Sequence, residues 1–231
     1  MNVQALLDIA HEENTKPEIY YTLLKYFART TQFLSWPFVF IFFRLFFKLE
    51  IKGRENLMVT SSPFIIISNH ISEYDSFAFR LILGRASGKL PLRFMAVNKF
   101  DIWYLNVLSG LFIIDILYVI FGVFVVEEGR GIEKNLREAV RIIGNGGNVV
   151  IYPEGSITKS GQIEKFKLGA AFLAQKTQVP VIPISMKIEE NIRGKDKFTI
   201  NIGKPIKVSS LLSPQTITHG FQNAISDLYK N

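Results

Sequence analysis

Short apolar runs alternate along this chain with longer segments that have helical spacing. The runs are rich in β-branched residues and hold four to six residues each, which predicts buried strands. They cover residues 64–68, 93–97, 123–126, 148–152, 179–184 and 198–202. The run at 179–184 contains Pro180 and Pro183, which cannot donate to a strand ladder, so we expect it at a sheet edge or a bend.

Between these runs, apolar residues recur every three or four positions, which predicts amphipathic helices. These segments cover residues 72–85, 132–143, 166–175 and 214–230. Strands that alternate with helices indicate an α/β fold. We therefore predict a single domain with a mostly parallel central sheet flanked by helices.

Residues 1–52 are predicted to form an N-terminal membrane-associating pair of helices, and residues 53–231 to form the α/β domain. The first helix of the pair is expected from Glu18 to about Phe33, and the second from Ser35-Trp36-Pro37 to Lys48. Residues 1–14 lack the basic start and apolar core of a secretory signal.

The second predicted helix is apolar on almost every side, with six phenylalanines between residues 38 and 48. It is shorter than the ~20 apolar residues that span a bilayer. Trp36 stands at one end, and Arg44 and Lys48 stand at the other. An interfacial helix with an aromatic anchor and snorkelling basic residues fits this pattern. The alternative is a helix buried against the main domain.

Residues 103–126 form the most apolar tract of the chain. Its length allows a transmembrane helix, but Asp115 in the middle would be costly in a bilayer. We favour a buried helix followed by a strand at 123–126. Such a tract also suits the wall of a slot for a fatty chain.

Composition narrows the classes of function. The chain has no cysteine and three histidines, which excludes thiol catalysis and disfavours a multi-histidine metal site. Its net charge of +7 suits an anionic membrane surface, an anionic substrate or nucleic acid, although a basic solvated surface is the simpler interpretation. Nucleic acid is not expected as the partner, because the chain is 48% hydrophobic and its basic residues form no long runs.

Candidate chemistry begins where the run at 64–68 ends. His70 follows this predicted strand, and Asp75 comes five residues later, at the start of the next helix. A carboxylate bonded to one imidazole nitrogen leaves the other nitrogen free to take a proton from a hydroxyl. Ser72 and Asp75 also have the spacing of a weak capping pair. His70 and Asp75 are therefore our candidate catalytic pair, with ordinary loop residues as the alternative.

A second polar turn, Tyr152-Pro153-Glu154-Gly155-Ser156, follows the run at 148–152. Its proline and glycine favour a tight turn whose N–H groups face a ligand. Glu154 is a candidate acceptor of hydrogen bonds from a substrate hydroxyl. The alternative is a surface turn with a structural carboxylate.

Four ordered patterns together resemble the glycerolipid acyltransferase family, whose best-known members are the lysophosphatidate acyltransferases. They are Asn69-His70-x4-Asp75, Tyr152-Pro153-Glu154-Gly155-Ser156, Phe166-Lys167-x-Gly169-Ala170 and Val179-Pro180-Val181-Ile182-Pro183-Ile184. The resemblance covers roughly residues 53–205.

The resemblance implies an α/β fold with an apolar acyl slot and a helical pair that rests on the membrane. It also implies transfer of an acyl group from a thioester, acyl-CoA or acyl-carrier protein, to a lysolipid hydroxyl. His70 would be the general base and Asp75 its orienting partner. Acceptor binding would fall to Glu154, Gly155 and Ser156, with positive charge from Lys159 and Lys167. Neither a metal nor a cofactor nor a covalent acyl-enzyme is implied.

Two departures from the family pattern concern the acceptor. The family usually has an arginine soon after its Gly-x-Phe strand and another after its glutamate–glycine turn. Glu127 and Ile157 stand near those places in this chain, and the nearest arginine to the first is Arg130. An arginine fork suits a phosphate dianion better than the point charge of a lysine. The pattern Glu-Gly-Ser-x-Thr-x-x-Gly instead looks like members that reacylate lysophospholipids with diester head groups.

We therefore predict an O-acyltransferase at the cytoplasmic face of a membrane, acting on a lysophospholipid. Lysophosphatidate, 1-acyl-glycerol-3-phosphate, is the first candidate for the acceptor. The alternative is a non-catalytic lipid-binding protein of the same fold on a membrane surface.

Overall fold

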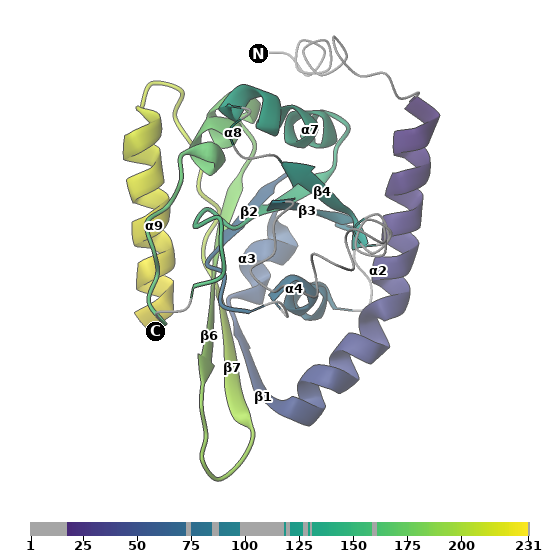
Figure 1. Ribbon diagram of the computed structural model, residues 1–231, viewed down its shortest axis with the longest axis vertical. Coiled ribbons are helices and arrows are strands. Elements are labelled where there is room, and N and C mark those ends of the chain that lie inside the picture. The colour runs from purple at the N-terminus through teal and green to yellow at the C-terminus, as the bar shows by residue number, and fades with distance from the viewer. Residues whose placement is uncertain are drawn as a thin grey trace.

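The computed structural model describes residues 18–72, 75–84, 88–97, 118, 121–126, 129, 131–158 and 161–230. Within them the strands form one seven-stranded sheet in the order β1-β7-β6-β2-β5-β3-β4 (Figure 1). The strands are β1 (Phe47–Lys52), β2 (Ile65–Ser68), β3 (Leu92–Val97), β4 (Val123–Val126), β5 (Asn148–Ile151), β6 (Val181–Glu189) and β7 (Asp196–Ile202). The helices are α2 (Glu18–Phe46), α3 (Arg54–Val59), α4 (Asp75–Leu83), α7 (Ile132–Gly144), α8 (Gly169–Thr177) and α9 (Pro214–Lys230).

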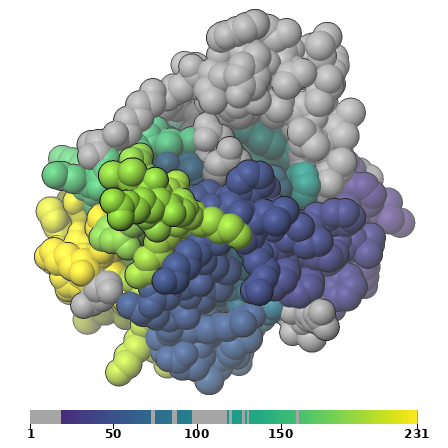
Figure 2. Space-filling model, turned by 90° about the horizontal axis from the view of Figure 1, so that it is seen from below, coloured from purple at the N-terminus to yellow at the C-terminus, as the bar shows by residue number. Residues whose placement is uncertain are grey.

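The sheet is mostly parallel, as the sequence predicts. Five neighbouring strand pairs run parallel, and β6 and β7 alone run antiparallel among the described strands. The β6–β7 hairpin projects from one end of the molecule, and Figure 2 looks at that end, with α2 on one side and α9 on the other.

Helices cover both faces of the sheet. Helices α7, α8 and α9 pack on one face, and α2, α3 and α4 pack on the other. Strand β2 lies at the centre and supplies both layers, because successive side chains of a strand point to opposite faces. Ile65 and Ile67 enter the first cluster and Ile66 enters the second, each with no exposed surface. Burial of such a side chain contributes about 1.5–3 kcal/mol, which holds β2 firmly in the middle of the fold.

The expected pair of N-terminal helices is a single helix, so this prediction is wrong. Helix α2 runs through Pro37 without a break. Proline removes one helical hydrogen bond, and Figure 1 shows α2 bending along its length. The Gln32 carbonyl near this point accepts the Ser35 hydroxyl at 2.9 Å, a bond within α2. It also accepts Arg80 Nε at 2.6 Å, and this bond ties α2 to α4.

The predictions also missed two elements that follow α2. Residues Phe47–Lys52 form strand β1, which pairs in parallel with β7, and Arg54–Val59 form α3. The N-terminal segment 1–52 therefore contributes a strand to the sheet.

The proline-containing strand β6 lies inside the sheet, between β7 and β2, and not at an edge. Its place is tolerated because Pro183 stands where the ladder with β7 ends. The Pro183 carbonyl accepts the Gly203 N–H at 2.8 Å, just beyond the last paired residue of β7, Ile202. The residue without an N–H therefore lies at the end of the β6–β7 ladder, where no further paired residue of β7 depends on it.

Several predictions fall outside the described residues. These are the segment 1–14, most of the apolar tract at 103–126, and the side chains of Glu127, Arg130 and Lys159. Strand β4, at the end of the apolar tract, lies where the sequence predicts it.

Candidate active site

The two polar loops predicted as a site lie beside each other. Strands β2 and β5 are parallel neighbours, with Ile67 opposite Ile151, so the loops that follow them meet at the same edge of the sheet. A backbone hydrogen bond of 2.7 Å from the Thr158 N–H to the His70 carbonyl joins the loops directly. Open α/β sheets place their ligand sites at this edge.

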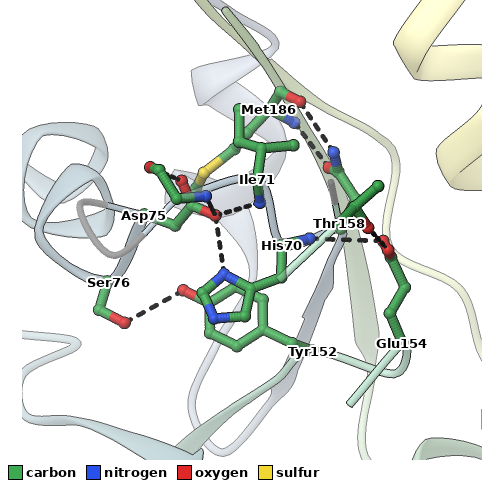
Figure 3. A network of polar contacts seen from close by, with 10 residues as sticks. His70, Ile71, Asp75, Ser76, Tyr152, Glu154, Thr158 and Met186 are labelled. Carbon is green, nitrogen blue, oxygen red and sulfur yellow. Dashed lines mark hydrogen bonds and ion pairs between the residues drawn. The ribbon is translucent and has the colours of Figure 1, made fainter. Parts of the chain in front are cut away.

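His70 and Asp75 are in direct contact (Figure 3). His70 Nδ1 lies 2.9 Å from Asp75 Oδ2. The histidine side chain is 19% exposed, whereas the aspartate side chain has no exposed surface. The imidazole can therefore meet a substrate while its partner stays out of water.

The Asp75 carboxylate is held by three further hydrogen bonds. Oδ2 also accepts the backbone N–H groups of Ile71 at 2.7 Å and Ser72 at 3.1 Å, and Oδ1 accepts the Ser72 hydroxyl at 2.6 Å. Asp75 is the first residue of α4. The Ser72 hydroxyl, predicted to cap this helix by accepting a backbone N–H, instead donates to the Asp75 carboxylate. An ionised carboxylate only accepts, so the hydrogen-bond network assigns the proton of neutral His70 to Nδ1 and the lone pair to Nε2.

Tyr152 packs flat against His70. The two ring centroids lie 4.0 Å apart with an angle of 13° between the planes, and the phenol oxygen lies 3.2 Å from Ser76 Oγ. Burial and, secondly, the nearby Asp75 carboxylate raise the pKa of Tyr152 well above its ordinary value. The phenol is therefore neutral, and the ring limits the rotation of the imidazole.

Asn69 ties the histidine loop to the opposite neighbouring strand. Its side-chain amide donates to the Met186 carbonyl and accepts the Met186 N–H, both at 2.8 Å. This buried side chain thus continues the β2–β6 ladder after Ser68, where β2 ends. Asn69 and Tyr152 belong to the sequence patterns around His70 and Glu154, but those patterns predict no role for either residue.

Glu154 lies between the two loops and is 4% exposed. Its carboxylate accepts the Thr158 hydroxyl at one oxygen and the His70 N–H, at 3.4 Å, at the other. Burial raises the pKa of Glu154, although the Thr158 hydroxyl and backbone N–H groups oppose that shift. Both oxygens already have partners within the protein, so the observed contacts are those of a structural carboxylate, and its role in acceptor binding remains a prediction.

The remaining predicted site residues surround the turn after β5. Gly155 has a φ of 79°, and a Cβ placed there would lie 2.5 Å from Lys167 Nζ, which puts the ammonium over the turn. The Lys167 N–H donates to the Pro153 carbonyl at 2.7 Å. Ser156 is exposed beside them, and Ile157 is half-buried.

An apolar cavity of about 220 Å³ lies beside this site. Ser76, which bonds Tyr152, is one of its lining residues, so the cavity begins next to the His70 neighbourhood. Most of its lining residues belong to helices α2 and α4 and strands β3 and β4. Its lining residues are Gln32, Ser35, Ser76, Phe77, Arg80, Leu83, Leu90, Leu92, Phe94, Tyr118, Phe121 and Val123.

Fold and site together define an α/β protein with a histidine–aspartate pair at the carboxyl edge of its sheet, next to an apolar cavity. The sequence model of the acyltransferase family matches residues 48–187, which include both loops. The chain therefore belongs to the acyltransferase family.

Similar proteins carry related names. A chloroplastic 1-acyl-sn-glycerol-3-phosphate acyltransferase of Arabidopsis thaliana is 30% identical over 70% of this chain and 44% of its own. A similar enzyme of Brassica napus is 30% identical over 61% of this chain and 38% of its own, so the match spans less than half of either plant relative. Human 1-acyl-sn-glycerol-3-phosphate acyltransferase beta is 27% identical over 70% of this chain and 55% of its own.

A solved structure shares the fold. The crystal structure of the 1-acyl-sn-glycerophosphate acyltransferase PlsC from Thermotoga maritima matches 98% of this chain and 87% of its own, with a TM-score of 0.58. At 19% sequence identity, this likeness concerns the fold alone.

Proposed function

We propose that the protein is an O-acyltransferase that moves a fatty acyl group from an acyl thioester to the free hydroxyl of a lysophospholipid. The observation that carries the proposal is the bond between His70 and a buried, fully bonded Asp75. It leaves Nε2 as a basic nitrogen at a partly exposed position beside an apolar cavity.

In the proposed reaction, His70 Nε2 takes the proton of the lysolipid hydroxyl as its oxygen attacks the thioester carbonyl. A carbon–oxygen bond forms, the carbon–sulfur bond breaks, and the imidazolium returns its proton to the leaving thiolate. Asp75 stabilises the imidazolium and holds the ring in place. General-base assistance of this kind contributes about 10²–10⁴-fold to the rate.

The cavity is our candidate for the acyl slot. Phe77, Leu83 and Phe94 give it an apolar lining, and Tyr118, Phe121 and Val123 come from the apolar tract that the sequence suggested for this role. Each Å² of apolar surface that an acyl chain buries in this cavity contributes about 25 cal/mol to the free energy of binding.

The acceptor is proposed to be a lysophospholipid, with 1-acyl-glycerol-3-phosphate as the first candidate. The names of the similar proteins favour this acceptor. Lys167 over the Gly155 turn offers a positive charge for a phosphate group, with Lys159 as a further candidate in sequence. Ile157, where the family pattern has an arginine, favours an acceptor with a diester head group instead.

The exposed side of α2 is our candidate for contact with an anionic membrane surface. Its buried residues include Ala28, Gln32, Val39 and Phe43 along one face. Large apolar side chains stay exposed along the rest of the helix: Ile19, Leu23, Tyr26, Phe27, Phe33, Leu34, Phe38, Phe40, Ile41, Leu45 and Phe46. An exposed apolar surface of this kind marks an interaction site, and a helix lying in the membrane interface fits it. None of the described helices is both long and apolar enough to cross a bilayer.

The test is product analysis after incubation of the protein with one labelled acyl thioester and a panel of lysolipids in vesicles. We expect acylation of a lysophospholipid by the wild type and its loss in His70→Ala, with vesicle binding unchanged. Comparison of acyl-CoA with acyl-carrier protein identifies the donor. Absence of transfer to every lysolipid, with intact vesicle binding, would instead favour the lipid-binding protein.

A further inference from the structure

One buried cation lines the apolar cavity. Arg80, on α4, is 5% exposed and belongs to the cavity wall. Its Nε donates to the Gln32 carbonyl at 2.6 Å, and its Nη1 donates to the Gly84 carbonyl. Both acceptors are neutral, and burial lowers the pKa of this guanidinium, which nevertheless stays charged as arginine does in proteins.

The third guanidinium nitrogen, Nη2, has no hydrogen-bond partner among the residues that the structure describes. Among the described residues, five buried side-chain polar atoms lack one: Ser68 Oγ, Arg80 Nη2, Thr199 Oγ1, Asn201 Oδ1 and Thr218 Oγ1. Arg80 is the only charged group in this set, and the only one whose residue lines the cavity. A buried donor without an acceptor is unfavourable, and most such groups in native proteins have a partner.

The position of Arg80 suits an acceptor carried by a ligand. Ser76 and Arg80 lie four residues apart on α4, which places them on the same side of the helix about 6 Å apart along its axis. Ser76 bonds Tyr152, which stacks on His70. A chain that entered the cavity from the His70 side would therefore pass Ser76 first and reach Arg80 several methylene groups later.

We infer that the cavity selects acyl chains that carry a hydrogen-bond-accepting oxygen, such as a hydroxyl or keto group, along the chain, and that Arg80 Nη2 is the donor that recognises it. The inference rests on the proposed function in that it takes the cavity to be the acyl slot. An unsubstituted acyl chain would fill the cavity and leave the buried Arg80 donor without an acceptor, which is unfavourable. A chain with an oxygen at the right position would make this hydrogen bond and is therefore preferred.

The test compares binding of neutral methyl esters of long-chain fatty acids, either unsubstituted or with one hydroxyl at successive carbons, by displacement of an apolar fluorescent probe. For one position on the chain we expect the hydroxylated ester to bind roughly 10- to 100-fold more tightly than the unsubstituted ester, as for a hydrogen bond to a charged group. In Arg80→Met this ratio should fall close to one. The ratio is unaffected by a general loss of stability, which acts on both ligands alike.

Arg93→Met is the matched control. Arg93 is 7% exposed and donates from Nε to the Gly122 carbonyl at 2.8 Å, but it does not line this cavity. Its substitution should leave the ratio unchanged. Equal binding of all the esters by the wild type, or a preference that survives in Arg80→Met, would overturn the inference.

A free, unsubstituted fatty acid forms the last arm of the experiment. If it binds far more tightly than its methyl ester, and Arg80→Met abolishes that difference, Arg80 binds a carboxylate head and the inference fails. Because no arm requires turnover, the result is independent of acyl transfer. If the protein transfers no acyl group but still prefers a hydroxylated ester, the proposed function is wrong and the inference about the selectivity of the cavity holds.

Discussion

The ring of Tyr152 stacks on the imidazole of His70, with a centroid separation of 4.0 Å and an interplanar angle of 13°. The two residues come from different loops, one after β2 and the other after β5. The stack and the bond to Asp75 therefore restrain the imidazole from two directions, its face and its Nδ1 edge. If His70 is the base, as we propose, a ring held in this way does not need to find its orientation in each catalytic cycle.

The stack leads to a first prediction, that the ring of Tyr152 matters more than its hydroxyl. Tyr152→Phe keeps the ring and loses the bond to Ser76, and a neutral hydrogen bond contributes about 0.5–1.5 kcal/mol, so we expect at most a roughly tenfold loss of kcat. Tyr152→Leu removes the stack and should lower kcat further with little change in KM for the acceptor. Ser76→Ala, measured in parallel, should match Tyr152→Phe. Equal kcat values for the Phe and Leu variants would show that the stack does not position the base.

A second prediction concerns the charge of Asp75. Asp75→Asn can still accept the Ile71 and Ser72 N–H groups at one oxygen, but it cannot stabilise the imidazolium of the proposed transfer step. We expect kcat to fall by about 10²–10⁴-fold, measured with one acyl thioester and one lysolipid.

Ser72→Ala serves as the control for Asp75→Asn. It removes the 2.6 Å bond to Oδ1 and leaves the carboxylate charged. We expect a loss of stability of about 1.5–3 kcal/mol and a much smaller loss of kcat. If both variants lose activity to the same extent, the charge of the carboxylate is not what His70 requires.

The central part of this architecture was predictable because its signals are local. Strand β2 is a continuous β-branched run, and His70 and Asp75 are five residues apart, so a single loop brings them together. The approach of the Glu154 loop followed from a general rule, since the carboxyl ends of adjacent parallel strands meet at one edge.

The predictions that failed depend on contacts between distant residues. Phe47–Lys52 continues a phenylalanine-rich helical pattern, and it becomes a strand because it pairs with Asp196–Asn201, far along the chain. Pro37 suggested the start of a helix, yet α2 continues through it while packed on α4. Neither the stack of Tyr152 on His70 nor the Asn69 bonds to Met186 leave a periodic signal in the sequence.

A third prediction uses the raised pKa of Glu154. Its folded-state pKa lies above the unfolded value, so the native state holds the proton more tightly than the unfolded state does. Stability from this group is therefore fully present below the unfolded pKa, near 4.5, and is lost as the pH rises through the folded pKa. Glu154→Gln imitates the protonated form and removes the titration.

We therefore expect the unfolding temperature of the wild type, relative to that of Glu154→Gln, to fall as the pH rises from below 4.5. Thermal unfolding followed across this range provides the measurement. Thr158→Ala is the companion variant: it removes the hydroxyl that favours the ionised form, so its decline with pH should be steeper than that of the wild type. A constant difference between wild type and Glu154→Gln at all pH values would contradict the raised pKa.

A fourth prediction addresses the exposed side of α2. Phe38 is 74% exposed on this helix, and burial of a phenylalanine side chain contributes about 1.5–3 kcal/mol. If the ring enters a membrane, Phe38→Ser should weaken binding to anionic vesicles by about tenfold or more. The free energy of unfolding in solution should change by no more than about 0.5 kcal/mol, as for surface substitutions elsewhere.

Leu211→Ser provides a matched comparison, because Leu211 is 93% exposed and precedes α9, which lies across the molecule from α2 (Figure 1). Its substitution should leave vesicle binding unchanged. A similar loss in both variants would indicate general hydrophobic adsorption and not a contact through α2. Phe38→Ser could instead destabilise the fold and leave vesicle binding unaffected. That result would show that the exposed side of α2 packs against protein, because loss of a phenylalanine ring lowers the free energy of unfolding strongly only where the ring is buried.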